Sequence, residues 1–288
     1  LAVYLGGSHV TVWSTNMDHR SSLPVYTVNA FTDACFGGNP AAVVPLKTQL
    51  TDELMQSIAA QHNLSETAFL EALGEDHYKL RWFSPTAEVP LCGHATLAAA
   101  YAMDYCRGWC GDELRFETAS GDLFVTRQDG RLTIEFPAVL MDSIDLVPAI
   151  QAALGVPVLG MYQPQQSAWQ MVCEVESQAV VEACSPDFSA LIAATELGVA
   201  ITARGEIADF VSRFFIPQLG IDEDPVTGSA HCQLTPFWAK RLDKTTLAAQ
   251  QLSERGGQLR CEWQDSRVRL TGSCSLFAEG KLYLPSDH

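Results

Sequence analysis

The chain has 288 residues, of which 47% are hydrophobic and 18% charged, so it is a globular protein long enough for one large domain or two of ordinary size. Its formal net charge of −16 argues against nucleic acid or an anionic membrane as a partner. No apolar run approaches the roughly 20 residues of a membrane-spanning helix. We therefore expect a cytoplasmic protein that binds neither nucleic acid nor a membrane.

The predicted elements begin after an N-terminal segment. Residues 1–22 lack the basic start and the small-residue cleavage site of a signal peptide. We interpret them as an extension, native or added by cloning, with Met17 as a candidate start. Strands are predicted at 23–31 and 41–46. The turn between them, Phe-Gly-Gly-Asn-Pro at 36–40, is of a kind that Gly and Asn tolerate.

Helices and strands then alternate. Thr51 is predicted to cap a helix that has acidic residues in its first turn and ends at Asn63 in a left-handed conformation. Strands are predicted at 64–70 and 77–83. The next segment, 93–103, has almost no polar face, and a helix that is apolar all round is a buried one. We therefore expect this helix inside a curved sheet.

The second half of the chain repeats this organisation. A helix is predicted at 228–241, where Pro236 should kink or restart it. Short helices and strands are mixed between 137 and 213, and strand follows strand from 258 to 284. Three pairs of segments match in the same order, at offsets of 132 to 136 residues. They are Arg81–Pro85 with Arg213–Pro217, Glu88–Ala95 with Glu223–Ala230, and Gly121–Leu132 with Gly257–Val268. We infer a duplication, with halves at 23–137 and 138–285; the last strand is free to return to the first half.

The duplicated segments place two helix starts in equivalent positions, at Gly93 and Gly228. A helix N-terminus offers unpaired N–H donors and about half a positive charge, so it binds a carboxylate or a phosphate without Lys or Arg. Gly lets a ligand approach the backbone closely, although a glycine can also simply open a helix. If the halves face each other, both helix starts point into one cleft and form an anion site.

Polar residues gather at these helix starts. His94 follows the first glycine, Ser229 is its duplicate partner, and Asp224 lies in the Glu-Asp-Pro turn. His94 is interpreted as functional, with a cap or a core histidine as the alternative. The Glu-Asp-Pro pattern is equally compatible with two roles for Asp224, a structural turn residue and a residue of the functional site. Glu66 lies in an otherwise apolar strand; it either faces solvent or is partly buried, and partial burial would make it a stronger base.

Cysteine and histidine spacing gives no metal site. Nine cysteines, an odd number, do not indicate a disulfide framework, and no Cys-x-x-Cys or His-x-x-x-His occurs. We predict no metal ion. Cys92 precedes Gly93, and a helix N-terminus favours a thiolate, so Cys92 is a candidate acid/base thiol. Its duplicate partner is Thr227, which rules out a symmetric pair of thiols.

These motifs together resemble a known family. The segments Val28–Val43, Asn63–Phe69, Phe83–Thr96 and Glu223–Ala230 are similar to the phenazine biosynthesis (PhzF-like) isomerase family. The resemblance covers roughly residues 23–285. It implies an α+β fold of the diaminopimelate epimerase type, in which two similar halves each wrap a curved mixed or antiparallel sheet round a central helix. The active site then lies in the cleft between the halves.

The resemblance also implies roles for individual residues. Glu66 corresponds to the acid/base of the family, His94 and Asp224 to residues that assist it, and the backbone at Gly93 and Ser229 to the groups that bind the substrate carboxylate. Gly228, Thr227, Cys92 and Asn39 complete the candidate substrate-binding set. The family uses no metal and no organic cofactor, and its members are often homodimers. We therefore expect a proton shift on a small carboxylate-bearing amino or hydroxy acid.

Two other functions remain open at this point. One is an epimerase, racemase or dehydratase of amino or hydroxy acids that uses Cys92. The other is a non-catalytic protein that binds small acids in the same cleft. The joint presence of Glu66, His94 and Asp224 favours an enzyme, because binding alone needs only the helix ends.

Overall fold

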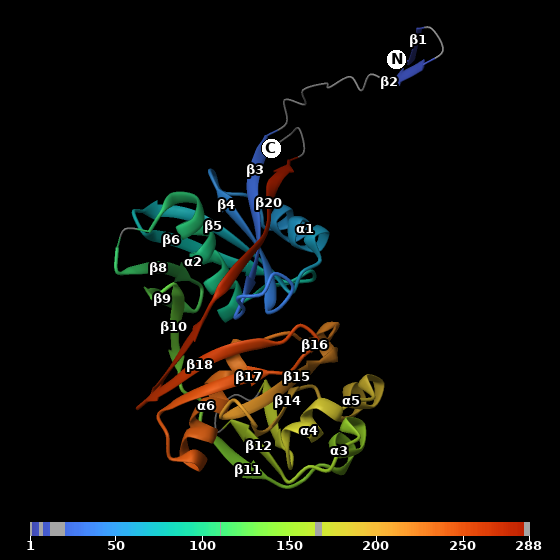
Figure 1. The fold of residues 1–288 in the computed structure, drawn as a ribbon, viewed down its shortest axis with the longest axis vertical. Helices are drawn as coiled ribbons and strands as arrows, with labels where there is room; N and C mark the ends of the chain where they lie inside the picture. Colours follow the sequence, from blue (N-terminus) through green and yellow to red (C-terminus); the bar gives the residue numbers. More distant parts are fainter. Residues whose placement is uncertain (1, 6–7, 12–20, 110, 165–168, 285–288) are drawn as a thin grey trace.

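The computed structural model describes residues 2–5, 8–11, 21–109, 111–164 and 169–284. It has a mixed α+β fold, dominated by sheet and containing few helices, which confirms the α+β part of the predicted fold class (Figure 1). The strands β1 (Ala2–Leu5) and β2 (Ser8–Thr11) form a sheet of their own, apart from the body of the molecule. Over the described ranges, the helices are all too short or too polar to cross a membrane.

Figure 1 shows the body as two lobes, one above the other. The first lobe contains α1 (Asp52–His62), α2 (Gly93–Arg107), β3 (Ser22–Ala30), β4 (Asn39–Leu46), β5 (Glu66–Gly74), β6 (His77–Phe83), β7 (Glu88–Val89), β8 (Glu113–Thr118), β9 (Gly121–Gln128) and β10 (Arg131–Pro137). The second contains α3 (Pro148–Leu154), α4 (Gln178–Ala183), α5 (Phe188–Ala194), α6 (Gly228–Leu242), the 3-10 helix Pro217–Leu219, β11 (Met141–Ile144), β12 (Gly160–Pro164), β13 (Gln170–Glu174), β14 (Gly198–Arg204), β15 (Phe210–Ile216), β16 (Ile221–Asp224), β17 (Thr246–Gln251) and β18 (Gly257–Gln264). Two further strands, β19 (Arg267–Gly272) and β20 (Cys274–Tyr283), complete the chain.

Strand pairing follows the same sequence of directions in both lobes. In the first lobe the strands pair in the order β3–β4, β4–β5, β5–β6, β6–β8, β8–β9 and β9–β10. The second and fourth of these pairs are parallel, and the other four are antiparallel. The pairs β12–β13, β13–β14, β14–β15, β15–β17, β17–β18 and β18–β19 repeat that order. The lobes are joined because β19 also pairs with β10, and β20 returns to pair with β3.

Two buried helices form the centre of this arrangement. α2 is buried over its first three turns, as the lack of a polar face there predicts, and packs against strands of the first lobe. α6 has the same length and is also largely buried. One large hydrophobic core includes side chains from both helices and from the sheets around them. The sheets therefore fix both helix N-termini in place.

The structure decides one of two expectations about α6. Pro236 was expected to kink or restart the helix, and a restart is not seen, because α6 continues through it from Gly228 to Leu242. Proline has no N–H to donate to the carbonyl four residues before it, which is that of Cys232. That carbonyl accepts the backbone N–H of Val139 instead, at 3.0 Å. The freed acceptor is satisfied from outside the helix, so no break is required.

The core leaves no room for a side chain at Gly257, the first residue of β18. A Cβ there would lie 2.3 Å from Cγ2 of Val226 and 3.2 Å from the carbonyl oxygen of Phe31. We predict that Gly257→Ala lowers the free energy of unfolding by about 1–3 kcal/mol, measured by urea denaturation. Gly74→Ala is the control, because a Cβ at Gly74 has its nearest contact at 3.8 Å. Equal stability of the two variants would contradict the prediction.

Candidate active site

The candidate residues come from both lobes and meet where the two central helices begin. Glu66 is the first residue of β5, and His94 is the second residue of α2. Asn39 is the first residue of β4. Asp224 ends β16, and Thr227 is the N-cap of α6. Each of these side chains is therefore held at the end of a regular element, where backbone pairing fixes its position.

Glu66 and His94 form the closest pair of acid/base groups in this cluster. Oε2 of Glu66 lies 3.2 Å from Nε2 of His94, and the two side chains are 16% and 6% exposed. The approach is not aligned as a hydrogen bond, and among the residues that the structure describes neither atom has a hydrogen-bond partner. Both atoms are therefore able to interact with a third group. The structure thus favours the partly buried alternative for Glu66 over the solvent-facing one.

The amide of Asn39 connects the two lobes at this point. Its Nδ2 donates to Oδ1 of Asp224 at 2.7 Å and to the carbonyl of Val226 at 3.0 Å, and it lies 3.2 Å from Nδ1 of His94. The amide has two hydrogens for these three neighbours, so one of them is shared. Because an amide nitrogen cannot accept, the neutral His94 that is compatible with this contact carries its proton on Nε2. The charged form has a proton there as well. In either state His94 presents an N–H to Glu66.

Asn39 was expected among the substrate-binding residues. Its side chain is fully buried, and the contacts of its nitrogen are to the protein itself. Its role in the structure is to hold Asp224 and His94 in a fixed relation. The Gly-Gly-Asn-Pro turn was identified from the sequence, but the pattern gave no partner for the asparagine.

Burial and neighbouring charges change the pKa values of two site residues. Burial lowers the pKa of His94, but Cys92 and Glu66 raise it by more, so the net pKa lies above its ordinary value. Burial raises the pKa of Asp224 to about 6, although His94 and the hydrogen bonds from Thr227 and Asn39 act in the opposite direction. Asp224 therefore changes its charge close to neutral pH.

The structure corrects the expectation of a thiolate at Cys92. Its side chain is 7% exposed, and burial, together with the charge of Glu66, raises the pKa of the thiol to about 11. The N-terminus of α2 and the contact of Sγ with Nδ1 of His94, at 3.5 Å, do not offset this. Cys92 is a neutral thiol at physiological pH.

The starts of the two central helices lie against each other, as the repeat suggested. A Cβ added to Gly93 would lie 3.9 Å from Cα of Gly228, and one added to Gly228 would lie 3.8 Å from Cα of Gly93. Neither N-cap residue, Cys92 or Thr227, uses its side chain to cap its helix. The first N–H groups of both helices are therefore not capped by these two side chains, and Ser229, the second residue of α6, is half-buried beside them. Two helix N-termini this close together favour an anion.

Two buried glutamines belong to this region and were not identified from the sequence. Gln251, at the end of β17, accepts the backbone N–H of Thr227 and donates to the carbonyl of Asp224. Gln170, at the start of β13, donates to the carbonyl of Ser229 at 3.1 Å. Glutamine has no spacing rule that links it to distant turns, so no sequence pattern signals either residue.

No metal ion was expected from the sequence. The positions of the possible donor atoms in the cluster show whether one ion could bind them together. Within the described part of the chain, Glu66, Cys92 and His94 bring one donor atom each to within 4.8 Å of one another. The thiol, however, faces Nδ1 of His94, while the carboxylate faces Nε2 on the opposite edge of the ring. One ion bound to a ring nitrogen would reach both other donors only after side-chain rotation. The arrangement suits proton transfer better than metal binding.

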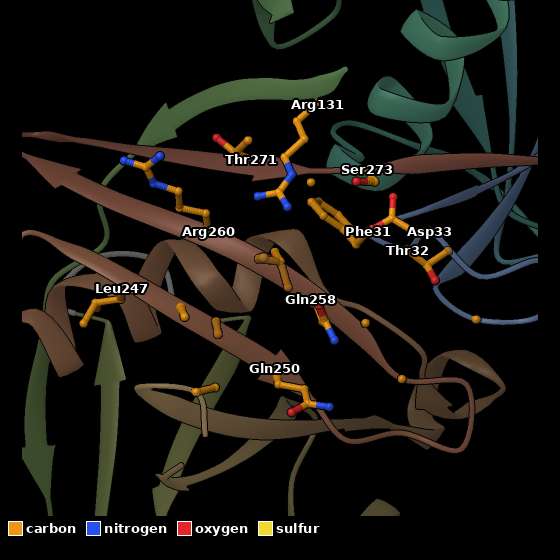
Figure 2. A pocket seen from close by; sticks show the side chains of 18 of the residues that line it. Phe31, Thr32, Asp33, Arg131, Leu247, Gln250, Gln258, Arg260, Thr271 and Ser273 are labelled. Carbon is orange, nitrogen blue, oxygen red and sulfur yellow. The ribbon is translucent and has the colours of Figure 1, made fainter. Parts of the chain in front are cut away.

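A groove of about 760 Å³ lies outside this cluster (Figure 2). It is lined by the segment at 31–37, by β17 and β18 and by Arg131, and it contains none of Glu66, His94 and Asp224. Figure 2 shows Gln250 and Gln258 at this groove. The candidate active site is therefore identified by its chemistry and not by the size of a cavity.

Comparison with known proteins supports an isomerase-type enzyme for this sheet-dominated α+β fold. The family model of the phenazine biosynthesis-like proteins matches residues 28–280. The chain belongs to this family, which confirms the resemblance drawn from its motifs.

Individual relatives agree. The chain is 48% identical over 265 residues to an uncharacterised isomerase of Pseudomonas aeruginosa, covering 91% of this chain and 99% of that one. It is 35% identical over 284 residues to the human phenazine biosynthesis-like domain-containing protein, covering 90% and 99%. The crystal structure of a PhzF-family protein from Enterococcus faecalis is similar with a TM-score of 0.87 and 44% identity, covering 92% and 100%. A hydroxyproline epimerase from Agrobacterium vitis, 12% identical with a TM-score of 0.55 and coverage of 91% and 93%, shares the fold alone.

The raised pKa of Cys92 predicts slow alkylation. A shift of two units, from 9.0 to about 11, leaves about 100-fold less thiolate at neutral pH, and burial restricts access further. We expect iodoacetamide to modify Cys92 at least 100-fold more slowly than the exposed Cys35 in the native protein, followed by mass spectrometry at pH 7.5. The two thiols should react alike in urea. Fast labelling of Cys92 in the native protein would show that it is a reactive thiolate.

Proposed function

We propose that this protein is a cofactor-independent isomerase that shifts a proton on a small carboxylate-bearing amino or hydroxy acid. Glu66 is the general acid/base, and His94 and Asp224 assist it. The observation that carries the proposal is the carboxylate of Glu66, 3.2 Å from Nε2 of His94, beside two helix N-termini that meet at Gly93 and Gly228. An acid/base and an anion site side by side are the two parts that such a reaction needs.

The recurring order of strand directions supports a duplicated chain with one site between its halves. α2 and α6 are 15 residues each and begin at duplicated glycines, and the short strands β7 and β16 pair with β6 and β15 in equivalent places. Two copies that face each other bring their helix starts together. The site is then composed of one helix start and its neighbours from each copy, which explains why candidate residues come from both lobes.

The substrate carboxylate binds at the helix starts. The backbone N–H groups around Gly93 and Ser229 donate to its oxygens, and the helix dipoles add electrostatic attraction without any cationic side chain. Gly93 and Gly228 allow this approach because a side chain at either position would fill the gap between the helices. The carboxylate end of the substrate is thus fixed, and the adjoining carbon is presented to Glu66.

The proton shift then needs only groups of this chain. Glu66 as carboxylate removes a proton from a carbon of the bound acid, and the electron pair of the broken C–H bond is delocalised within the substrate. The same carboxylic acid returns a proton to a different carbon, so atoms and charge balance and no oxidant is involved. The Nε2–H of His94 faces Oε2 of Glu66 and stabilises its ionised form. Asp224 holds His94 in place through Asn39.

The alternative functions have less support. An epimerase or dehydratase that uses Cys92 needs a thiolate, and the pKa of Cys92 is about 11. Its contact with His94 gives it a route to a proton, so the alternative stays testable, and a fully active Cys92→Ala protein would reject it. A binding protein would not require an acid/base pair beside the anion site, and the relatives named as isomerases favour an enzyme.

Removing the acid/base should abolish the proton shift. We predict that Glu66→Gln lowers the incorporation of solvent deuterium at least 100-fold, because the amide cannot accept the proton. The measurement is ¹H NMR in D₂O with a panel of cyclic and acyclic amino and hydroxy acids, including both diaminopimelate stereoisomers. Glu71→Gln, in the same strand β5, is the control and should leave exchange unchanged. Full exchange in the Glu66→Gln protein would reject the proposal.

The pKa of Asp224 predicts a pH dependence. Its carboxylate must be ionised to accept from both Asn39 and Thr227, so exchange should fall as the pH drops below about 6. Stability should change in the opposite direction: the folded pKa lies above the ordinary 3.8, so the folded form loses stability as the pH rises from about 4 to 6. Exchange and thermal unfolding measured from pH 4 to 8 test both trends. If the rate of deuterium exchange does not change across pH 6, the ionised Asp224 carboxylate is not required for the reaction.

A further inference from the structure

We infer that Gln251 is a positioning residue of this active site: it fixes the orientation of Asp224 and of the first residue of α6. Gln251 is fully buried at the end of β17. It lies against the turn that carries Asp224 and Thr227, and its side-chain amide makes three hydrogen bonds to these two residues. For its effect on catalysis this inference rests on the proposed function, whereas its effect on Asp224 does not.

The hydrogen bonds of Gln251 allow one orientation of its amide. Oε1 accepts the backbone N–H of Thr227 at 2.9 Å, and Nε2 donates to the carbonyl of Asp224 at 2.7 Å. A backbone N–H can only donate and a backbone carbonyl can only accept, so exchanging Oε1 and Nε2 would break both bonds. The position of the amide nitrogen is therefore determined by the main chain around it.

This orientation fixes the direction of the next hydrogen bond. Nε2 of Gln251 also lies 3.2 Å from Oγ1 of Thr227, and an amide nitrogen must be the donor. The hydroxyl of Thr227 accepts from Gln251, so its own hydrogen is free to point away, toward Oδ2 of Asp224 at 2.5 Å. Asn39 donates to the other carboxylate oxygen at 2.7 Å. Both oxygens of Asp224 are thereby given donors, which favours the ionised carboxylate against the effect of its burial.

The segment that follows Gln251 makes hydrogen bonds both to the turn after Asp224 and to the turn before Asn39 in the first lobe. Oγ of Ser253 donates to the carbonyl of Pro225 at 2.8 Å. Arg255 donates to the carbonyls of Gly37 and Gly38, at 2.9 and 2.8 Å, and the N–H of Gly38 donates to the carbonyl of Gly256. Gly38 immediately precedes Asn39. One short segment, 251–256, thus holds the turn that carries Asp224 and the turn that carries Asn39.

The neighbouring residue Gln250 provides a matched control. It is also a glutamine in β17, but it lies at the groove outside the cluster, as Figure 2 shows, and it is half-buried. Successive residues of a strand point to opposite faces, so Gln250 turns away from Asp224. Gln250→Met and Gln251→Met therefore make the same chemical change in the same strand, on opposite faces of the sheet.

The test is a pH titration of the Asp224 carboxyl carbon by ¹³C NMR, assigned with Asp224→Asn. In the wild type and in Gln250→Met we expect a midpoint near 6. In Gln251→Met we expect the midpoint to rise by about 0.5–1 unit, because the donor at Oδ2 is no longer oriented and an apolar group replaces the amide. The acidic limb of the deuterium exchange profile should move up by the same amount, so exchange at pH 6 should fall about two- to fivefold.

A second variant covers the case in which Gln251→Met does not fold. Thr227→Val keeps the backbone N–H that Gln251 accepts and removes the hydroxyl, so it should raise the Asp224 midpoint in the same way. An unchanged midpoint in either folded variant would overturn the inference. A raised midpoint in a protein whose wild type catalyses no exchange would uphold the positioning role and reject the isomerase proposal instead.

Discussion

One buried amide group, that of Asn39, determines much of this structure. Its nitrogen reaches Asp224 and Val226 in one lobe and His94 in the other, and a fully buried donor is costly unless its acceptors stay in place. The turn before it is correspondingly constrained. Gly38 has a φ of +66°, and a Cβ there would lie 2.2 Å from the carbonyl oxygen of Ala30. Only glycine allows the chain to enter β4 with Asn39 pointing between the lobes.

The two buried helices give the site its electrostatics and its rigidity. Their N-termini would repel each other as like partial charges, yet the cores around them hold Gly93 and Gly228 in contact range. An anion between them relieves that repulsion, so the fold itself favours a carboxylate at this place. The carbonyl left free by Pro236 is satisfied by Val139 at the start of the second lobe, which ties α6 to the segment that connects the lobes.

Local rules predicted the elements well, and they predicted the site in part. The cap at Thr51 and the left-handed Asn63 are seen as expected, because both depend only on neighbouring residues. The apolar segment at 93–103 gave the buried helix. The sequence motifs identified Glu66, His94 and Asp224 as candidate site residues, and the structure places all three in one cluster. Gln251 and the bridging role of Asn39 were not predictable, because each depends on partners that only tertiary folding brings near.

The difference between the two N-cap residues gives the site its asymmetry. Cys92 and Thr227 are the N-cap residues of α2 and α6, but Cys92 is a neutral thiol beside His94, while Thr227 has a hydroxyl that donates to Asp224. A racemase that uses two equivalent bases would need matching groups on both sides of its substrate. Here Glu66 and His94 belong to the first lobe, and the second lobe supplies the carboxylate of Asp224, which is held by Thr227 and Asn39. The proposed reaction, in which the single base Glu66 removes and returns a proton, fits this arrangement better than a reaction with two equivalent bases.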